Sequence, residues 1–163
     1  MEKMIIHNDT FFADVLQVLR QGKQVTIPVK GYSMLPFIRG GKDLVVLEKA
    51  GDDLKADDIV LFHVGPADGG RYVMHRILSM NGDAVDIMGD GVPKAHEHVH
   101  RNQILAKAVQ IIRGGKCPVD PYAPGQLRLV HFWQRLLPVR RYILFIYRHL
   151  PWNRSWIKEN RNI

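Results

Sequence analysis

The stretch Val29-Lys30-Gly31-Tyr32-Ser33-Met34-Leu35-Pro36 decides how the rest of the chain is interpreted. Gly31 permits backbone angles that other residues avoid, so the chain can turn sharply just before Ser33. Pro36 fixes its own φ and favours an extended conformation for Leu35. We therefore expect the Ser33 hydroxyl to sit on a tight, rigid turn that follows an apolar segment.

A serine hydroxyl acts as a nucleophile only when a base takes its proton. The candidate base is His75, which lies further along the chain in the run Tyr72-Val73-Met74-His75-Arg76-Ile77. An unperturbed histidine titrates near about pH 6.5, so it can accept a proton at neutral pH without special burial. A lysine in this position would first need its pKa lowered by desolvation.

Four segments of the chain, in this order, resemble the type I signal peptidase superfamily, to which the self-cleaving repressors of the SOS response also belong. They match its nucleophile box, its G-D-I-V-x-F strand, its general-base box and the G-D that closes the domain. The segments are Gly31-Tyr32-Ser33-Met34-Leu35-Pro36, Ala56-Asp57-Asp58-Ile59-Val60-Leu61-Phe62, Val73-Met74-His75-Arg76-Ile77 and Met88-Gly89-Asp90-Gly91. The resemblance runs from about Val25 to about Val109. A histidine before the arginine is typical of the endoplasmic-reticulum and archaeal branch, whereas bacterial leader peptidases and SOS repressors have lysine there.

The resemblance implies a catalytic set of Ser33 as nucleophile, His75 as base and a carboxylate that orients the histidine. We expect Asp90 to be that carboxylate. The histidine branch usually has a second aspartate about six residues further on; here that position is His96, followed by Glu97, so Glu97 is the alternative.

The resemblance also assigns the surroundings of the nucleophile. Gly31 has no hydroxyl two residues before Ser33, so the oxyanion hole would depend on backbone N–H groups, including that of Ser33. We expect Tyr32, Met34 and Pro36 to contact substrate. The implied substrate is an extended leader-type peptide with small residues before the cut, bound by strand addition.

The order of apolar and turn-forming residues predicts a mainly β fold, a signal-peptidase-like β domain with a short N-terminal helix and a C-terminal helical tail. The first helix is expected from Asp9 to Gln21, and the tail helices from Leu127 to Leu137 and from Val139 to Leu150, with a break at Pro138. Expected strands are Val25–Val29, Leu44–Leu47, Ile59–Val64, Arg71–Leu78, Ala84–Met88 and Gln103–Ile112. The catalytic domain would span residues 1–112, a linker 113–126 and the tail 127–163.

Charge is concentrated in the tail. Residues 113–163 contain ten Lys and Arg against two Asp and Glu, while residues 1–112 contain thirteen against fourteen. Bulky apolar side chains alternate with arginines there. This pattern fits either a helical pair packed on the β domain or a helix lying on a membrane surface. A nucleic-acid arm is not expected, because the aromatic residues follow no recognised binding module.

The composition also bears on disulfides, metal sites and cellular location. Cys117 is the single cysteine, so an intrachain disulfide is excluded, and we expect it to be a bystander. His96, His98 and His100 alternate, but we interpret them as a polar surface loop rather than a metal site, and we expect no cofactor. The chain starts without a secretory signal and has no long apolar run, so we expect it in the cytoplasm, peripheral on the inner face of the membrane if the tail binds lipid.

The sequence therefore predicts a serine endopeptidase acting on peptide or protein substrates. The alternative is a non-catalytic or self-cleaving regulatory or binding module on the same fold. The oligomeric state stays open.

Overall fold

The structure, a computed structural model, describes residues 8–66, 70–92 and 96–150. Its helices are α1 (Asn8–Arg20), the short 3-10 helix η1 (Arg101–Gln103), α2 (Pro124–Arg135) and α3 (Leu137–His149). Its strands are β1 (Val25–Pro28), β2 (Leu44–Lys49), β3 (Ile59–Val64), β4 (Arg71–Asn81), β5 (Ala84–Met88), β6 (Glu97–His100), β7 (Ile104–Arg113) and β8 (Cys117–Val119).

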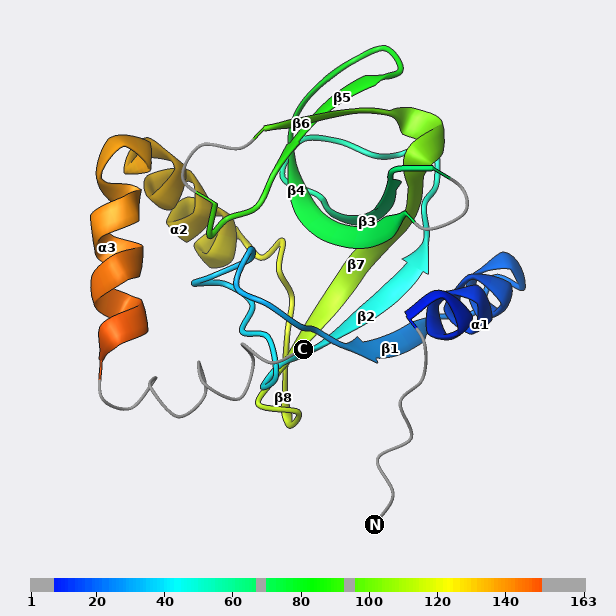
Figure 1. The fold of residues 1–163 in the computed structure, drawn as a ribbon, viewed down its shortest axis with the longest axis horizontal. Coiled ribbons are helices and arrows are strands. Elements are labelled where there is room, and N and C mark those ends of the chain that lie inside the picture. The colour runs from blue at the N-terminus through cyan, green and yellow to red at the C-terminus, as the bar shows by residue number, and fades with distance from the viewer. Residues whose placement is uncertain (1–7, 67–69, 93–95, 151–163) are drawn as a thin grey trace.

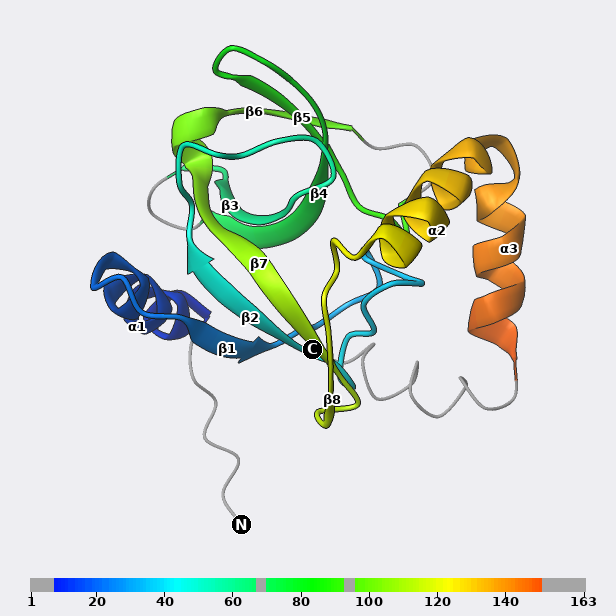
Figure 2. The same ribbon diagram turned by 180° about the vertical axis from the view of Figure 1, so that it is seen from behind.

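All of these strands belong to one curved antiparallel sheet (Figure 1). The strand order is β1-β2-β7-β3-β4-β5-β6, and β8 pairs with the end of β7. Helix α1 lies beside β1 and β2, whereas α2 and α3 lie on the other side of the molecule (Figures 1 and 2). The predicted mainly β fold with a short N-terminal helix and a helical tail is confirmed.

Two strands were not predicted. Residues 97–100 form β6 at one end of the strand order, where only Val99 is fully buried, so their sequence has the polar character of a surface loop. Residues 117–119 form β8 inside the expected linker. The tail helices separate at Leu136 rather than at Pro138, because proline is tolerated in the first turn of a helix, where α3 places it.

Apolar side chains fill three clusters. Val15 and Leu19 of α1 pack with strand residues such as Val45 and Leu61 in the first cluster. The second cluster lies between β3, β4, β5 and β7 and contains Phe62. The third joins the Ser33 loop to the tail helices.

The loop that carries Ser33 is fixed by the residues after it. Met34 packs into the first cluster and is 2% exposed, while Leu35 is fully buried in the third, against Trp133. Gly31, whose φ of 80° suits glycine, begins the turn as expected. Because Met34 and Leu35 are buried in different clusters, the backbone at Ser33 has little conformational freedom.

The segment Gly89-Asp90-Gly91 packs against this loop backbone to backbone. The Gly91 N–H donates a 2.7 Å hydrogen bond to the Ser33 carbonyl. A Cβ at Gly91 would lie 2.3 Å from the Tyr32 carbonyl oxygen, and one at Gly89 would lie 2.4 Å from that of Ser33. The close approach explains why glycine stands on both sides of Asp90.

We predict that Gly91→Ala lowers the free energy of unfolding by about 1–3 kcal/mol, because the new methyl group must displace backbone. Gly125→Ala is the matched control, since a Cβ there meets nothing within 4 Å and alanine is the better helix former. Urea denaturation measures both. Equal stability of the two variants would contradict the close packing of these segments.

Candidate active site

His75 lies in the middle of β4, opposite Val60 of β3. Its side chain is buried, with 7% of the residue exposed, and its ring centroid is 5.9 Å from that of Phe62. Two neighbouring strands therefore fix the ring on the face of the sheet that carries the second apolar cluster.

Glu97 holds the imidazole. Its Oε2 lies 3.0 Å from His75 Nδ1. The strand pairing places it there, because Glu97 pairs with Ile87, Ile87 pairs with Ile77, and His75 is two residues before Ile77. Paired residues, and residues two apart on a strand, share one face of a sheet. The alternative carboxylate considered from the sequence is thus the one that contacts the histidine.

This contact decides which ring nitrogen of His75 carries the proton. A carboxylate only accepts hydrogen bonds, so Nδ1 is the donor toward Glu97. In the neutral ring Nε2 then has a free lone pair, which is the atom a general base uses. Arg71 Nη2 lies 3.8 Å from the other Glu97 oxygen, a contact that the sequence did not suggest.

Burial lowers the pKa of His75, because the charged imidazolium loses its hydration. The negative charge of Glu97 opposes this effect without cancelling it. The ring is therefore neutral at pH 7. Since the folded-state pKa lies below the ordinary value of about 6.5, the associated stability is present above that value and is lost as the pH falls through the lowered pKa.

The Nε2 atom of His75 faces the Ser33 loop across Gly89. A Cβ built on Gly89 would lie 2.9 Å from Nε2 and 2.4 Å from the Ser33 carbonyl oxygen. The structure thus brings the backbone of Ser33 close to the His75 ring. Within the described part of the chain, no hydrogen bond joins the Ser33 hydroxyl to His75, and the Ser33 N–H has no protein acceptor.

Asp90 forms no hydrogen bond with His75; its carboxylate binds Arg76 instead, contrary to the prediction from the sequence. It forms a bidentate ion pair with Arg76, whose Nε and Nη2 lie 3.0 and 2.8 Å from its two oxygens. Arg76 and Asp90 are 1% and 3% exposed. The reason is the alternation of strand residues: Arg76 points away from the face of His75 and pairs with Met88, two residues before Asp90.

The ion pair also anchors the tail. Trp133 of α2 donates its indole N–H to the Asp90 carbonyl at 2.7 Å. Arg76 Nη1 donates to the Asp57 carbonyl at 2.8 Å, and His131 of α2 lies 2.8 Å from the Asp57 carboxylate. Sequence patterns could not predict these contacts, because they join segments far apart along the chain.

The three residues expected to contact substrate lie in different environments. Met34 is a core residue and lies out of reach of a substrate, which corrects that assignment. Tyr32 is half-buried and packs with the third cluster. Pro36 borders an apolar hollow of about 320 Å³ together with Phe37, Phe132 and Trp133. Tyr32 and Met34 do not line this hollow.

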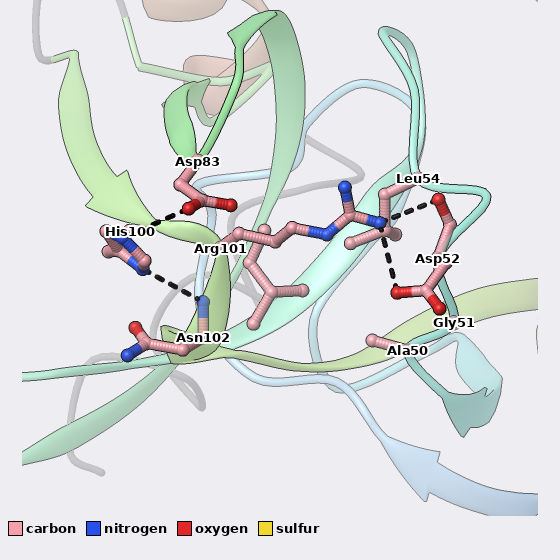
Figure 3. A pocket seen from close by; sticks show the side chains of 9 residues that line it. Ala50, Gly51, Asp52, Leu54, Asp83, His100, Arg101 and Asn102 are labelled. Atoms are coloured by element: carbon pink, nitrogen blue, oxygen red, sulfur yellow. Dashed lines mark hydrogen bonds and ion pairs between the residues drawn. The ribbon is translucent and has the colours of Figure 1, made fainter.

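A second hollow, of about 290 Å³, lies between the loop from β2 to β3, the turn from β4 to β5 and η1, and neither Ser33 nor His75 lines it (Figure 3). Its charged side chains are already paired. Arg101 donates to the Asp52 carbonyl at 2.6 Å, and His100 Nε2 lies 3.7 Å from Asp83. We assign no chemistry to it.

The alternating histidines His96, His98 and His100 are all exposed, and His98 binds Asp86 at 2.5 Å. No group of three His, Cys, Asp or Glu side chains in the described ranges is arranged to hold a metal ion.

Comparisons with protein-family models, with curated proteins and with solved structures found no match.

We predict that Asp90→Asn lowers the free energy of unfolding by about 3–5 kcal/mol, because it leaves the Arg76 charge buried without a counter-charge. Asp86→Asn is the matched control; its carboxylate is 43% exposed and meets water, so its loss should cost far less stability than the loss of the Asp90 charge. Urea denaturation at neutral pH compares them. If both variants have wild-type stability, the ion pair does not have the structural role assigned to it.

Proposed function

We propose that the protein is a serine peptidase with Ser33 as nucleophile and His75 as general base. One observation carries the proposal: the Nδ1 atom of His75 is held by Glu97, and its Nε2 faces the Ser33 loop across Gly89. A nucleophile, a base and a group that orients the base are the parts that acyl transfer needs. The resemblance of the four sequence segments to signal peptidases points to the same chemistry.

The proposed reaction is hydrolysis of a peptide bond through an acyl-enzyme. The Ser33 oxygen attacks the scissile carbonyl carbon as His75 Nε2 takes the hydroxyl proton. His75 then gives that proton to the leaving amine as the carbon–nitrogen bond breaks. A water molecule, deprotonated by His75, hydrolyses the ester and restores the Ser33 hydroxyl. Glu97 keeps the imidazole in the required tautomer and stabilises its charged form.

The negative charge that develops on the substrate's carbonyl oxygen must be stabilised by hydrogen-bond donors, which form an oxyanion hole. The Ser33 N–H is the first candidate, because it has no acceptor among the described residues. In the absence of substrate, hydrogen bonds between a nucleophile and its base are often long or unformed, so the lack of a Ser33–His75 bond is compatible with this reaction.

An extended peptide is the substrate that the resemblance favours. In the described strand order the two ends are β1 and β6, and β6 carries Glu97. An end strand offers unpaired backbone groups to which an extended segment can add. A peptide added to β6 would run beside Glu97, the residue that holds His75.

The competing proposal is a regulatory or binding module that keeps the fold without catalysis. In that case the Ser33 hydroxyl would be no more reactive than that of an ordinary surface serine. The reactivity of Ser33 therefore separates the two functions without knowledge of the substrate.

We predict that a fluorophosphonate probe labels the wild-type protein at Ser33, because an adjacent base activates the hydroxyl. Ser33→Ala should abolish labelling, and Glu97→Gln should slow it by about 10–10⁴-fold, since the imidazole loses its orienting carboxylate. Ser79→Ala is the control, because the Ser79 hydroxyl is exposed and already bonded to Asp86 at 2.8 Å. Labelling that is absent from the wild type, or unchanged in Ser33→Ala, would favour the binding module.

The pH dependence of labelling tests the base. The rate should rise as His75 loses its proton, with a midpoint below about pH 6.5, and then reach a plateau, because burial lowers the pKa of His75. Rates measured from about pH 5 to 9 define the profile. A rate that rises only above about pH 8.5 would contradict a histidine base.

A further inference from the structure

The exposed large apolar side chains of the described residues all lie on the two tail helices. Phe132, Phe145 and Ile146 are each 62% exposed. The complete set, here called the apolar tail face, is Leu129, Phe132, Val139, Tyr142, Ile143, Phe145 and Ile146. Helix α3 lies farther from the sheet than α2 does (Figures 1 and 2), and the exposed fractions of these side chains place the face at the molecular surface.

The opposite side of the same helices already provides the packing that the fold requires. Trp133 of α2 and Leu144 of α3 are buried in the third cluster around Leu35. Arg140 is 1% exposed, and its guanidinium donates to the Trp133 carbonyl at 3.2 Å. On α3, Arg140 and Leu144 are four residues apart and so share the inward face. The apolar tail face is therefore not needed to cover the β sheet.

The charge around this face has one sign. Residues 121–150 include five arginines and no Asp or Glu. Arg128 and Arg135 of α2 and Arg141 of α3 are exposed. Two copies of the chain that met through this face would bring their arginines together without a carboxylate from residues 121–150 of either copy. An anionic surface would meet both the apolar side chains and the positive charges.

We propose that the apolar tail face binds the surface of a membrane rich in anionic phospholipid. Phe132, Phe145 and Ile146 would enter the boundary between headgroups and acyl chains, and the exposed arginines would lie at the lipid phosphates. Tyr142 has the apolar ring and polar tip that suit this boundary. No helix of the described residues is long and apolar enough to span a membrane, so the contact is one of the surface.

The apolar tail face continues toward the Ser33 loop. Leu129 and Phe132, two of its members, border the apolar hollow that also contains Pro36 and Phe37. Binding through the tail would therefore place the Ser33 loop close to the lipid surface. The consequence for substrate choice, peptides presented at the membrane, rests on the proposed function; the lipid binding itself does not.

The test is sedimentation of the full chain with vesicles of phosphatidylcholine, with and without phosphatidylglycerol. Wild type should sediment with the anionic vesicles and be released as the ionic strength rises from about 0.05 to 0.5 M, because salt screens the arginine contacts. The double variant Phe145→Ser/Ile146→Ser should lose about tenfold or more in affinity, since two apolar side chains no longer enter the lipid. Ser33→Ala should bind like wild type.

A matched pair of charge variants shows whether position or only net charge matters. Arg128→Gln/Arg135→Gln removes two charges from the tail, and Arg20→Gln/Lys23→Gln removes two exposed charges near the end of α1, on the other side of the molecule. Only the first should weaken binding, by about tenfold. Each variant must unfold at the wild-type temperature.

Three results would overturn the proposal: no sedimentation with anionic vesicles, an equal loss in both charge variants, or a wild-type dimer that Phe145→Ser/Ile146→Ser converts to a monomer without any change in vesicle binding. The last result would identify the face as an interface between copies. Because Ser33→Ala binds lipid if the proposal is right, failure of the peptidase activity would leave this result unaffected.

Discussion

The buried ion pair between Arg76 and Asp90 is the constraint on which the arrangement of the site depends. Arg76 follows His75 on β4, and Asp90 lies between two glycines whose backbone packs on the Ser33 loop. The pair therefore fixes the distance between the strand that carries the base and the loop that carries the nucleophile. Removing one member would leave the other charged and buried, which is far more costly than never having buried the pair.

The same pair explains why the tail helices belong to the site. The Asp90 carbonyl accepts from Trp133, and Trp133 packs with Leu35 two residues after Ser33. Tyr122 fixes the chain just before α2, because its hydroxyl accepts from the Ile59 N–H at 3.1 Å and donates to the Ala108 carbonyl at 2.6 Å. One side of α2 and α3 thus buttresses the Ser33 loop. The other side is free for a surface contact.

The sequence predicted the fold well where the signal is local. Alternating apolar residues between turn formers located six strands, such as Ile59–Val64, and Gly31 located the turn before Ser33. The sequence did not predict the features that depend on how the strands pair. Residues 97–100 look polar because β6 buries only Val99, yet the register of β4, β5 and β6 makes Glu97 the partner of His75.

Asp90 and Met34 show the same limit. The resemblance to signal peptidases suggested a role in the site for both, Asp90 as the carboxylate that orients His75 and Met34 as a substrate contact. In a strand or a tight turn neighbouring side chains point in different directions, so the residue beside a functional one is often structural. Asp90 binds Arg76, and Met34 fills the core. The separation of these roles needs the register of the sheet, which no single segment contains.

Glu97 holds His75 as the tautomer with its proton on Nδ1 and its lone pair on Nε2. Long-range ¹H–¹⁵N correlation on protein labelled at histidine reports this directly, with His75→Gln used to assign the signals. At pH 7 we predict a neutral ring with a pyridine-type Nε2, and a shift toward the Nε2–H tautomer in Glu97→Gln. An imidazolium, or an Nε2–H tautomer in the wild type, would contradict it.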